Sequence, residues 1–167
     1  LTGEGKLLGS LRVRYSSGGA FRPRGVVHSS PLDGRLWACS GDGILRLDDT
    51  GKADVTLGEA AFGASQPLRH INALCVSDDG RIYAVNGATG AVHLFDKDGS
   101  LLHMLKPDAG DIGGHRGSGF ICVQGDGTVR YASTGPAGGF VRFDPNGQRV
   151  GRDPRLMDEV REEWCAI

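Results

Sequence analysis

This 167-residue sequence lacks the features that mark several common classes of protein. Its 19 basic and 20 acidic side chains leave a formal net charge of −1, which excludes a strongly basic nucleic-acid-binding arm and an acidic tail. No apolar run approaches the ~20 residues that a membrane-spanning helix needs, so we expect no membrane span. Hydrophobic residues still make up 39% of the chain, which is enough to build a core.

Cysteine spacing gives no sign of a zinc site or a redox pair, because no two of the four cysteines stand in a C-x-x-C arrangement. The repeat described below places Cys75 and Cys122 at equivalent positions on predicted inner strands, where small apolar side chains are expected. We therefore expect buried thiols, and reduced thiols slightly favour an intracellular setting. The four residues are Cys39, Cys75, Cys122 and Cys165.

Glycine is the abundant residue, at 28 of 167 positions, yet it shows neither the three-residue period of collagen nor a low-complexity run. Three aspartates recur at equal spacing along the chain, and a glycine stands at the third position after each of them. These pairs are Asp48 and Gly51, Asp96 and Gly99, and Asp144 and Gly147. An earlier Asp-Gly pair recurs at nearly the same spacing, at Asp33, Asp79 and Asp126. The excess glycine is therefore turn glycine in three repeated units.

Each unit has the pattern of four short strands. In the middle unit we expect strands near residues 71–76, 81–85, 91–95 and 100–105, with equivalent strands about 48 residues before and after. Asp79-Gly80 suits the first turn, because such turns need a positive φ. Four antiparallel strands per repeat of this length are typical of a β-propeller blade. The predicted fold class is all-β, a β-propeller segment of four-stranded antiparallel blades with a period of about 48 residues.

The predicted organisation has two parts. Residues 1–152 form an incomplete ring, with an outer strand at residues 5–13 followed by three blades, and residues 153–167 form a tail with a short C-terminal helix. Propellers contain about four to eight blades, so three do not close a ring. We expect the missing blades to come from the same propeller, from a second copy of the chain or from a protein partner.

The middle unit carries a resemblance to a known family. The stretch from Ile71 to Asn86, followed by Val92 to Asp96, resembles an NHL repeat and is similar to the blades of the SMP-30 and gluconolactonase group. The resemblance spans residues 5–148 and implies a propeller fold. The chain departs from the NHL pattern at the second turn of each unit, where the family usually has an Ala-Asp pair. Here the corresponding stretches are Ala38-Cys39-Ser40, Ala84-Val85-Asn86 and Ala132-Ser133-Thr134.

Basic side chains precede each predicted inner strand, at the place where propellers expose one mouth of the central channel. Arginine suits an anion site there, because its planar fork binds carboxylate and phosphate with two hydrogen bonds. The alternative is that these side chains pair with aspartates between blades. Nearby aromatic residues are sparse, which argues against a single-stranded nucleic-acid site, although some NHL-type propellers bind RNA or peptides on such a rim. The predicted rim consists of Arg22, Arg24, Arg69, His70, His115 and Arg116.

An enzymatic function is the main alternative. The lactonases of the similar group hold a divalent metal with a carboxylate and asparagines, and Asn72 falls where such an asparagine would be. The equivalent positions in the other units are about Arg24 and Ser118, which supply no carboxylate. We therefore expect no cofactor, and a metal only if this alternative holds.

The sequence favours a non-enzymatic binding or scaffolding module that takes part in protein–protein interaction within a larger propeller or complex. No catalytic set can be assembled from the spacing of its residues, and a repeat architecture offers a broad surface for partners. A metal-dependent lactonase or similar hydrolase is the first alternative. Anion or RNA binding on the arginine-rich rim is the second.

Overall fold

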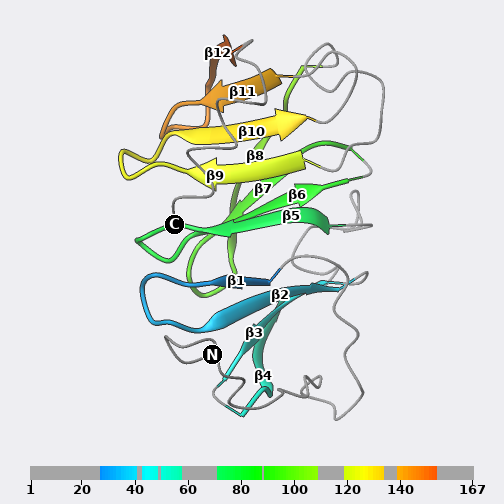
Figure 1. Cartoon of the computed structure of the whole chain (residues 1–167), viewed down its shortest axis with the longest axis vertical. Helices are drawn as coiled ribbons and strands as arrows, with labels where there is room; N and C mark the ends of the chain where they lie inside the picture. Colours follow the sequence, from blue (N-terminus) through cyan, green and yellow to red (C-terminus); the bar gives the residue numbers. More distant parts are fainter. Residues whose placement is uncertain are drawn as a thin grey trace, which may run out of the picture.

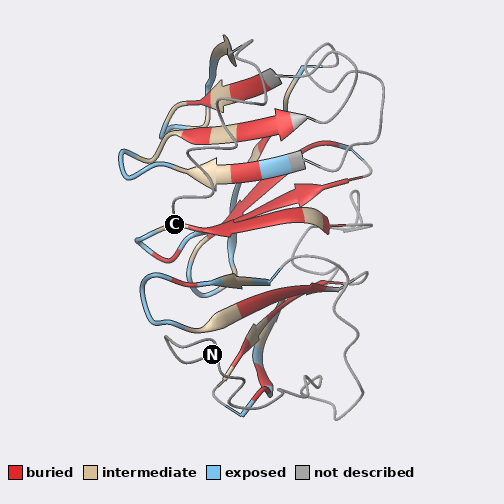
Figure 2. Ribbon diagram, viewed as in Figure 1, coloured by how far each residue is buried: buried red, intermediate tan, exposed pale blue. Residues whose placement is uncertain are grey.

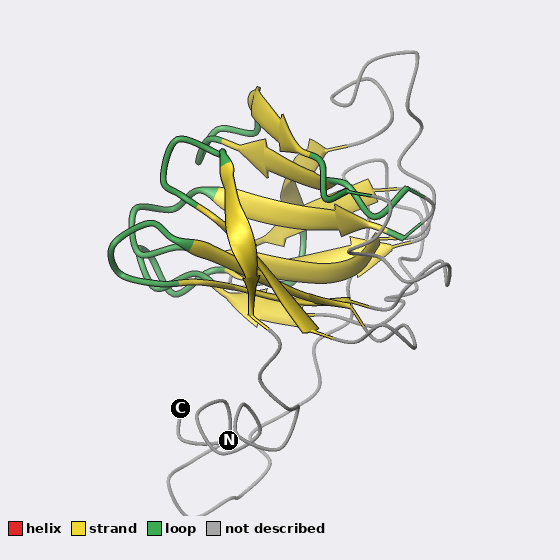
Figure 3. Ribbon diagram, turned by 90° about the horizontal axis from the view of Figure 1, so that it is seen from above, coloured by secondary structure: helices red, strands yellow, loops and turns green. Residues whose placement is uncertain are grey.

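The computed structural model describes residues 27–40, 43–48, 50–57, 71–87, 89–108, 119–133 and 139–153. These stretches form three four-stranded antiparallel sheets, which are stacked along the long axis of the molecule (Figures 1 and 3). No helix occurs in these ranges, so none is found there that could cross a membrane. The described part of the chain is therefore all-β, as predicted.

Each sheet is a simple meander in which consecutive strands are neighbours. The first sheet contains β1 (Val27–Ser29), β2 (Leu36–Ser40), β3 (Gly43–Leu47) and β4 (Ala53–Leu57). The second contains β5 (Ile71–Val76), β6 (Ile82–Asn86), β7 (Val92–Phe95) and β8 (Leu101–Leu105). The third contains β9 (Gly119–Val123), β10 (Val129–Ser133), β11 (Gly139–Phe143) and β12 (Arg149–Asp153).

The strands of the middle unit match the predicted ranges to within about one residue at each end. The outermost strands of the three sheets start at Ala53, Leu101 and Arg149, which are equally spaced along the chain, so the repeat is confirmed. The outer strand predicted at residues 5–13 lies outside the described residues. So does the predicted helix, because the description ends at Asp153, the last residue of β12.

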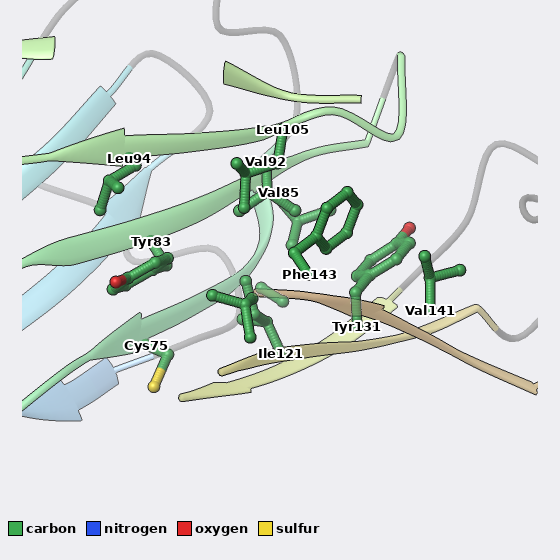
Figure 4. Packing of buried hydrophobic residues seen from close by; sticks show 12 residues of the cluster. Cys75, Tyr83, Val85, Val92, Leu94, Leu105, Ile121, Tyr131, Val141 and Phe143 are labelled. Carbon is green, nitrogen blue, oxygen red and sulfur yellow. The ribbon is translucent and has the colours of Figure 1, made fainter. Parts of the chain in front are cut away.

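The sheets pack through apolar side chains on facing surfaces. Trp37 of the first sheet packs with Leu74 and Phe95 of the second in one core. In the second core, Tyr83 and Val92 extend toward Ile121, Tyr131 and Phe143 of the third sheet (Figure 4). The strands of the second sheet are consequently buried on both faces except along β8 (Figure 2). Burial of each large apolar side chain contributes roughly 1.5–3 kcal/mol.

The first strands of the sheets bring neighbouring sheets together. Contacts between sheets are concentrated between β1 and β5 and between β5 and β9, whereas β4, β8 and β12 are outermost. Sheets that converge at their first strands and diverge at their fourth are arranged as blades around an axis. The described residues therefore form a β-propeller-like segment.

The repeated aspartate closes the turn before each outermost strand. Asp96 Oδ1 accepts hydrogen bonds from the backbone N–H groups of Asp98 and Ser100, at 2.9 and 2.8 Å. Asp48 and Asp144 accept the same two bonds from the residues two and four positions later. The carboxylate thus satisfies turn N–H groups that no strand partner reaches, which explains its recurrence in every unit.

A leucine side chain from the preceding sheet packs against the glycine of this turn. Leu57 of β4 lies against Gly99, and Leu105 of β8 lies against Gly147. Gly147 has a φ of 82°, and a Cβ atom there would lie 2.7 Å from Leu105 Cδ2. Both the backbone conformation and the space therefore require glycine.

We expect Gly147→Ala to destabilise the fold more than Gly34→Ala. Gly34 also has a positive φ, of 70°, but a Cβ there would meet no atom within 4 Å. Gly34→Ala should cost about 1–2 kcal/mol from backbone strain alone. Gly147→Ala should cost roughly 1–3 kcal/mol more, because buried Leu105 must move. Urea unfolding of both variants measures the difference, and equal losses would show that the leucine contact is unimportant.

Acid should weaken the fold through the turn aspartates. The backbone N–H of Ser100, followed by that of Asp98, holds the pKa of Asp96 below its ordinary value of 3.8. A carboxyl with a lowered pKa stabilises the folded chain above the unfolded pKa, and this stabilisation disappears as the pH falls through the folded value. We expect the urea concentration at the midpoint of unfolding to decrease when the pH is lowered below about 4. Asp96→Asn should reduce this acid dependence, whereas Asp98→Asn in the same turn should preserve it; identical acid profiles for all three proteins would refute the assignment.

Candidate binding surface

The basic rim predicted from the sequence cannot be placed in the structure. All of its members precede the inner strands β1, β5 and β9 and lie outside the described residues. They are Arg22, Arg24, Arg69, His70, His115 and Arg116. The rim therefore remains a prediction.

Asn72, the residue of the metal alternative, lies at an irregularity of β5. The register of β5 against β6 shifts between Ile71 and Ala73, and Asn72 occupies the step between them. Its side chain lies directly against Gly87 in the following turn, where a Cβ atom would not fit. Within the described ranges, no three His, Cys, Asp or Glu side chains are grouped so that they could hold a metal ion.

The third sheet presents a face that differs from the corresponding faces of the other two. Side chains alternate along a strand, and Val129, Tyr131, Val141 and Phe143 all pack toward the second sheet. The alternate residues of the same strands therefore point away from the second sheet. We call this surface the outward face; it consists of Phe120, Cys122, Arg130, Ala132, Phe140 and Arg142. Ala132 and Phe140 are buried, Arg130, Arg142 and Cys122 are half-buried, and Phe120 is exposed.

Two arginines lie directly opposite each other on the outward face. Arg130 of β10 pairs in register with Arg142 of β11. The Nε atoms of both are buried and have no hydrogen-bond partner, and neither forms an ion pair within the described part of the chain. Like charges directly opposite on antiparallel strands destabilise a sheet. In the part of the chain that the structure describes, the two positive charges thus lie side by side and neither is held in an ion pair.

The repeat shows what normally occupies these two positions. The equivalent cross-strand pair is Trp37 with Arg46 in the first sheet and Tyr83 with Leu94 in the second. Trp37 and Tyr83 each lie in the core shared with the next sheet. An aromatic residue that packs between sheets is thus replaced by Arg130 in the third sheet.

The first sheet neutralises its own arginine. Arg46 donates to Asp54, with Nε–Oδ1 and Nη2–Oδ2 distances of 3.0 and 3.1 Å, and its guanidinium lies 5.7 Å from the centre of the Trp37 ring. Arg35 also forms an ion pair with Asp54. Burial acts to raise the pKa of Asp54, but the hydrogen bond and charge of Arg46 and the charge of Arg35 outweigh it and hold that pKa below its ordinary value.

The third sheet has an arginine at this position but no acid at the position equivalent to Asp54. Asp54 is the extra residue at a register shift between β3 and β4, and the same shift occurs between β11 and β12. There the extra residue is Val150, whose side chain is 54% exposed. Gly151, which lies opposite Arg142, has no side chain to cover the guanidinium.

Large apolar side chains are exposed on the outward face of the third sheet and on the outermost strands of the second and third sheets. Phe120 of the outward face is 55% exposed. On the outermost strands β8 and β12, Leu101, Leu102 and Val150 are 41%, 43% and 54% exposed. Exposed apolar side chains in regular strands mark candidate interaction surfaces when they lie together.

Two of the cysteines lie in the cores between sheets, and a third lies on the outward face. Cys39 and Cys75 are buried, as expected, and burial raises the pKa of Cys39 to about 12. Cys122 takes the place of Cys75 in the third sheet but is only half-buried, so the expectation of equal burial is wrong. The reason is that Cys75 faces the third sheet, whereas Cys122 lies on the outward face.

No protein-family profile and no curated protein matches the sequence. Among solved structures, a protein of unknown function from Bacteroides caccae aligns with 82% of this chain at 18% identity and a TM-score of 0.56. The extracellular domain of a protein described as a hybrid two-component system of Bacteroides thetaiotaomicron aligns with 95% at 15% identity and a TM-score of 0.58. A streptogramin B lyase aligns with 75% at 17% identity and a TM-score of 0.48.

The chain spans 51%, 20% and 41% of the lengths of these three proteins. The first two likenesses concern the fold alone, because their sequence identities are low.

We expect Cys122 to be alkylated faster than Cys39 and Cys75 in the folded protein. A pKa of about 12 leaves Cys39 with roughly a thousandfold less thiolate than an ordinary thiol has. Burial also raises the pKa of Cys75. Iodoacetamide labelling at pH 8 with site-resolved mass spectrometry measures the three rates, and urea should equalise them. Rapid labelling of Cys39 without denaturant would contradict the packing described here.

Proposed function

We propose that this chain is a non-enzymatic propeller segment that binds other proteins, as part of a larger propeller or complex. The observation that carries the proposal is the exposure of Leu101, Leu102 and Val150 on the outermost strands β8 and β12. Each of these strands is the edge strand of its sheet that lies farthest in the strand order from the inner strand, where a partner has access to it. Transfer of such side chains into an interface releases free energy in proportion to the apolar area buried.

The blade pattern supports the same proposal. Residues 71–96 resemble an NHL repeat, and propellers of that type include binding modules for peptides and RNA. We propose that the blades of this chain are of the NHL type. The described part of the chain contains three sheets, whereas a closed propeller ring has about four to eight blades. Further blades or another chain therefore fit naturally beside them.

The test replaces apolar side chains on the outer strands. The variant Leu102→Ser with Val150→Ser removes two exposed apolar groups, and Lys97→Ser with Asn146→Ser changes two exposed turn residues of the same sheets as a matched control. A partner is identified by affinity purification from the source cells, purified, and titrated against all three proteins. We expect the apolar variant to bind at least ~tenfold more weakly, which corresponds to about 1.4 kcal/mol, and the control to bind as the wild type does.

Circular dichroism of the variants confirms that each is folded before binding is compared. Equal affinity of all three proteins for every partner would contradict the proposal. So would a chain that binds one divalent metal ion and hydrolyses a lactone, with both properties lost in Asn72→Ala.

A further inference from the structure

We propose that the outward face of the third sheet binds an acidic protein surface, and that Arg130 and Arg142 together recognise its carboxylates. The inference rests on the proposed protein-binding function and specifies the chemistry of the partner. It starts from the two guanidinium groups that lie opposite each other and form no ion pair within the described ranges.

The hydrogen-bonding state of these arginines favours a ligand. The Nε atoms of Arg130 and Arg142 are buried and donate to no acceptor. A buried donor without an acceptor is costly, and a charged one more so. Carboxylates match the planar donor fork of arginine and accept two parallel hydrogen bonds from it. Arg130 and Arg142 are half-buried, so a partner that brings carboxylates to this face would bind their terminal N–H groups and reduce the repulsion between the two like charges.

The first sheet provides the internal precedent. Arg46, the counterpart of Arg142, is held by both carboxylate oxygens of Asp54. In the third sheet the counterpart of Asp54 is Val150. The third sheet thus has the arginine without a carboxylate at the position that neutralises it in the first sheet. We infer that the anion comes from outside the sheet.

The neighbouring acid does not fill this role. Asp126 is an exposed residue of the turn between β9 and β10, and the backbone N–H and hydroxyl of Thr128 are the main groups that lower its pKa. The charge of Arg130 adds only a weaker effect, and no ion pair joins the two residues. Asp126 therefore leaves the Arg130 guanidinium available for a second carboxylate.

The surroundings of the pair favour protein over nucleic acid. Cys122 lies directly opposite Arg130, and Phe120, at 55% exposure, is the next residue on the same side of β9. An exposed aromatic side chain beside arginines is a combination that is enriched at the centres of protein interfaces. Binding of a phosphate backbone needs a longer run of exposed positive charge, and the chain as a whole has a net charge of −1.

The first test uses a fluorescent peptide of ten glutamates as the acidic probe, with a peptide of ten glutamines as its uncharged control. We expect the wild type to bind the glutamate peptide more tightly than the glutamine peptide in fluorescence anisotropy. Arg130→Gln with Arg142→Gln should weaken binding at least tenfold. Arg81→Gln with Lys97→Gln removes two positive charges elsewhere and should change the affinity less than twofold. Bound peptide should also slow the alkylation of Cys122.

A gain-of-acid variant separates recognition from folding. Val150→Asp restores, within the third sheet, the acid that the first sheet has at this position. We expect it to raise the melting temperature and to weaken binding of the glutamate peptide, because Arg142 becomes neutralised internally. A loss of affinity together with a gain in stability cannot result from misfolding.

Three results would overturn the inference. The first is unchanged binding of the glutamate peptide by Arg130→Gln with Arg142→Gln. The second is equal binding of the glutamate and glutamine peptides by the wild type. The third is tighter, arginine-dependent binding of a single-stranded oligonucleotide, which would assign the face to nucleic acid.

The purified partner distinguishes this inference from the proposed function. If the partner is released by the Leu102 and Val150 replacements but bound normally by the arginine variant, the inference fails and the proposed function stands. If no partner protein is found whose binding is weakened by the Leu102 and Val150 replacements or by the Arg130 and Arg142 replacements, the proposed function fails. Arginine-dependent binding of the glutamate peptide would then still support the recognition of carboxylates by this face.

Discussion

Apolar packing between consecutive sheets is the interaction on which the rest of this structure depends. A single four-stranded meander has two faces and cannot bury both, so each sheet is stable only because a neighbour covers it. Trp37 and Tyr83 show how this is achieved, since each projects from the second strand of its sheet into the core shared with the next. The turns, the constant repeat length and the position of the outer strands all preserve this alignment.

The strands could be predicted from the sequence because their signals are local. Asp79-Gly80 and the turn from Asp96 to Gly99 give the ends of strands directly, since few residues other than glycine accept a positive φ. The recurrence of these turns then gave the number of units. The burial of Cys75 followed from the same repeat, because its position on an inner strand places it between two sheets.

The candidate surface could not be predicted in the same way, because it depends on which face of a sheet has a neighbour. The repeat predicts the same burial for Cys122 as for Cys75, but burial depends on whether another sheet covers that face. Arg130 and Arg142 belong to different strands and become neighbours only through the strand register. Their signal was present as a departure from the repeat, in which charged residues replace the apolar Tyr83 and Leu94. The basic residues of the predicted rim lie before the inner strands, outside the ranges that the structure describes.

The contact between a leucine and the next turn glycine has a consequence for how such a chain can change over evolution. Leu57 meets Gly99, and Leu105 meets Gly147, so the same length of chain separates the two partners in both cases. A single-residue insertion or deletion within the strand that carries the leucine, or within the turn that carries the glycine, would move the leucine to the opposite face of its strand or the glycine out of the left-handed position. Gain or loss of a whole repeat unit would preserve every such contact. The architecture therefore excludes length changes inside these strands and turns, whereas duplication of a complete blade lengthens the chain without disturbing them.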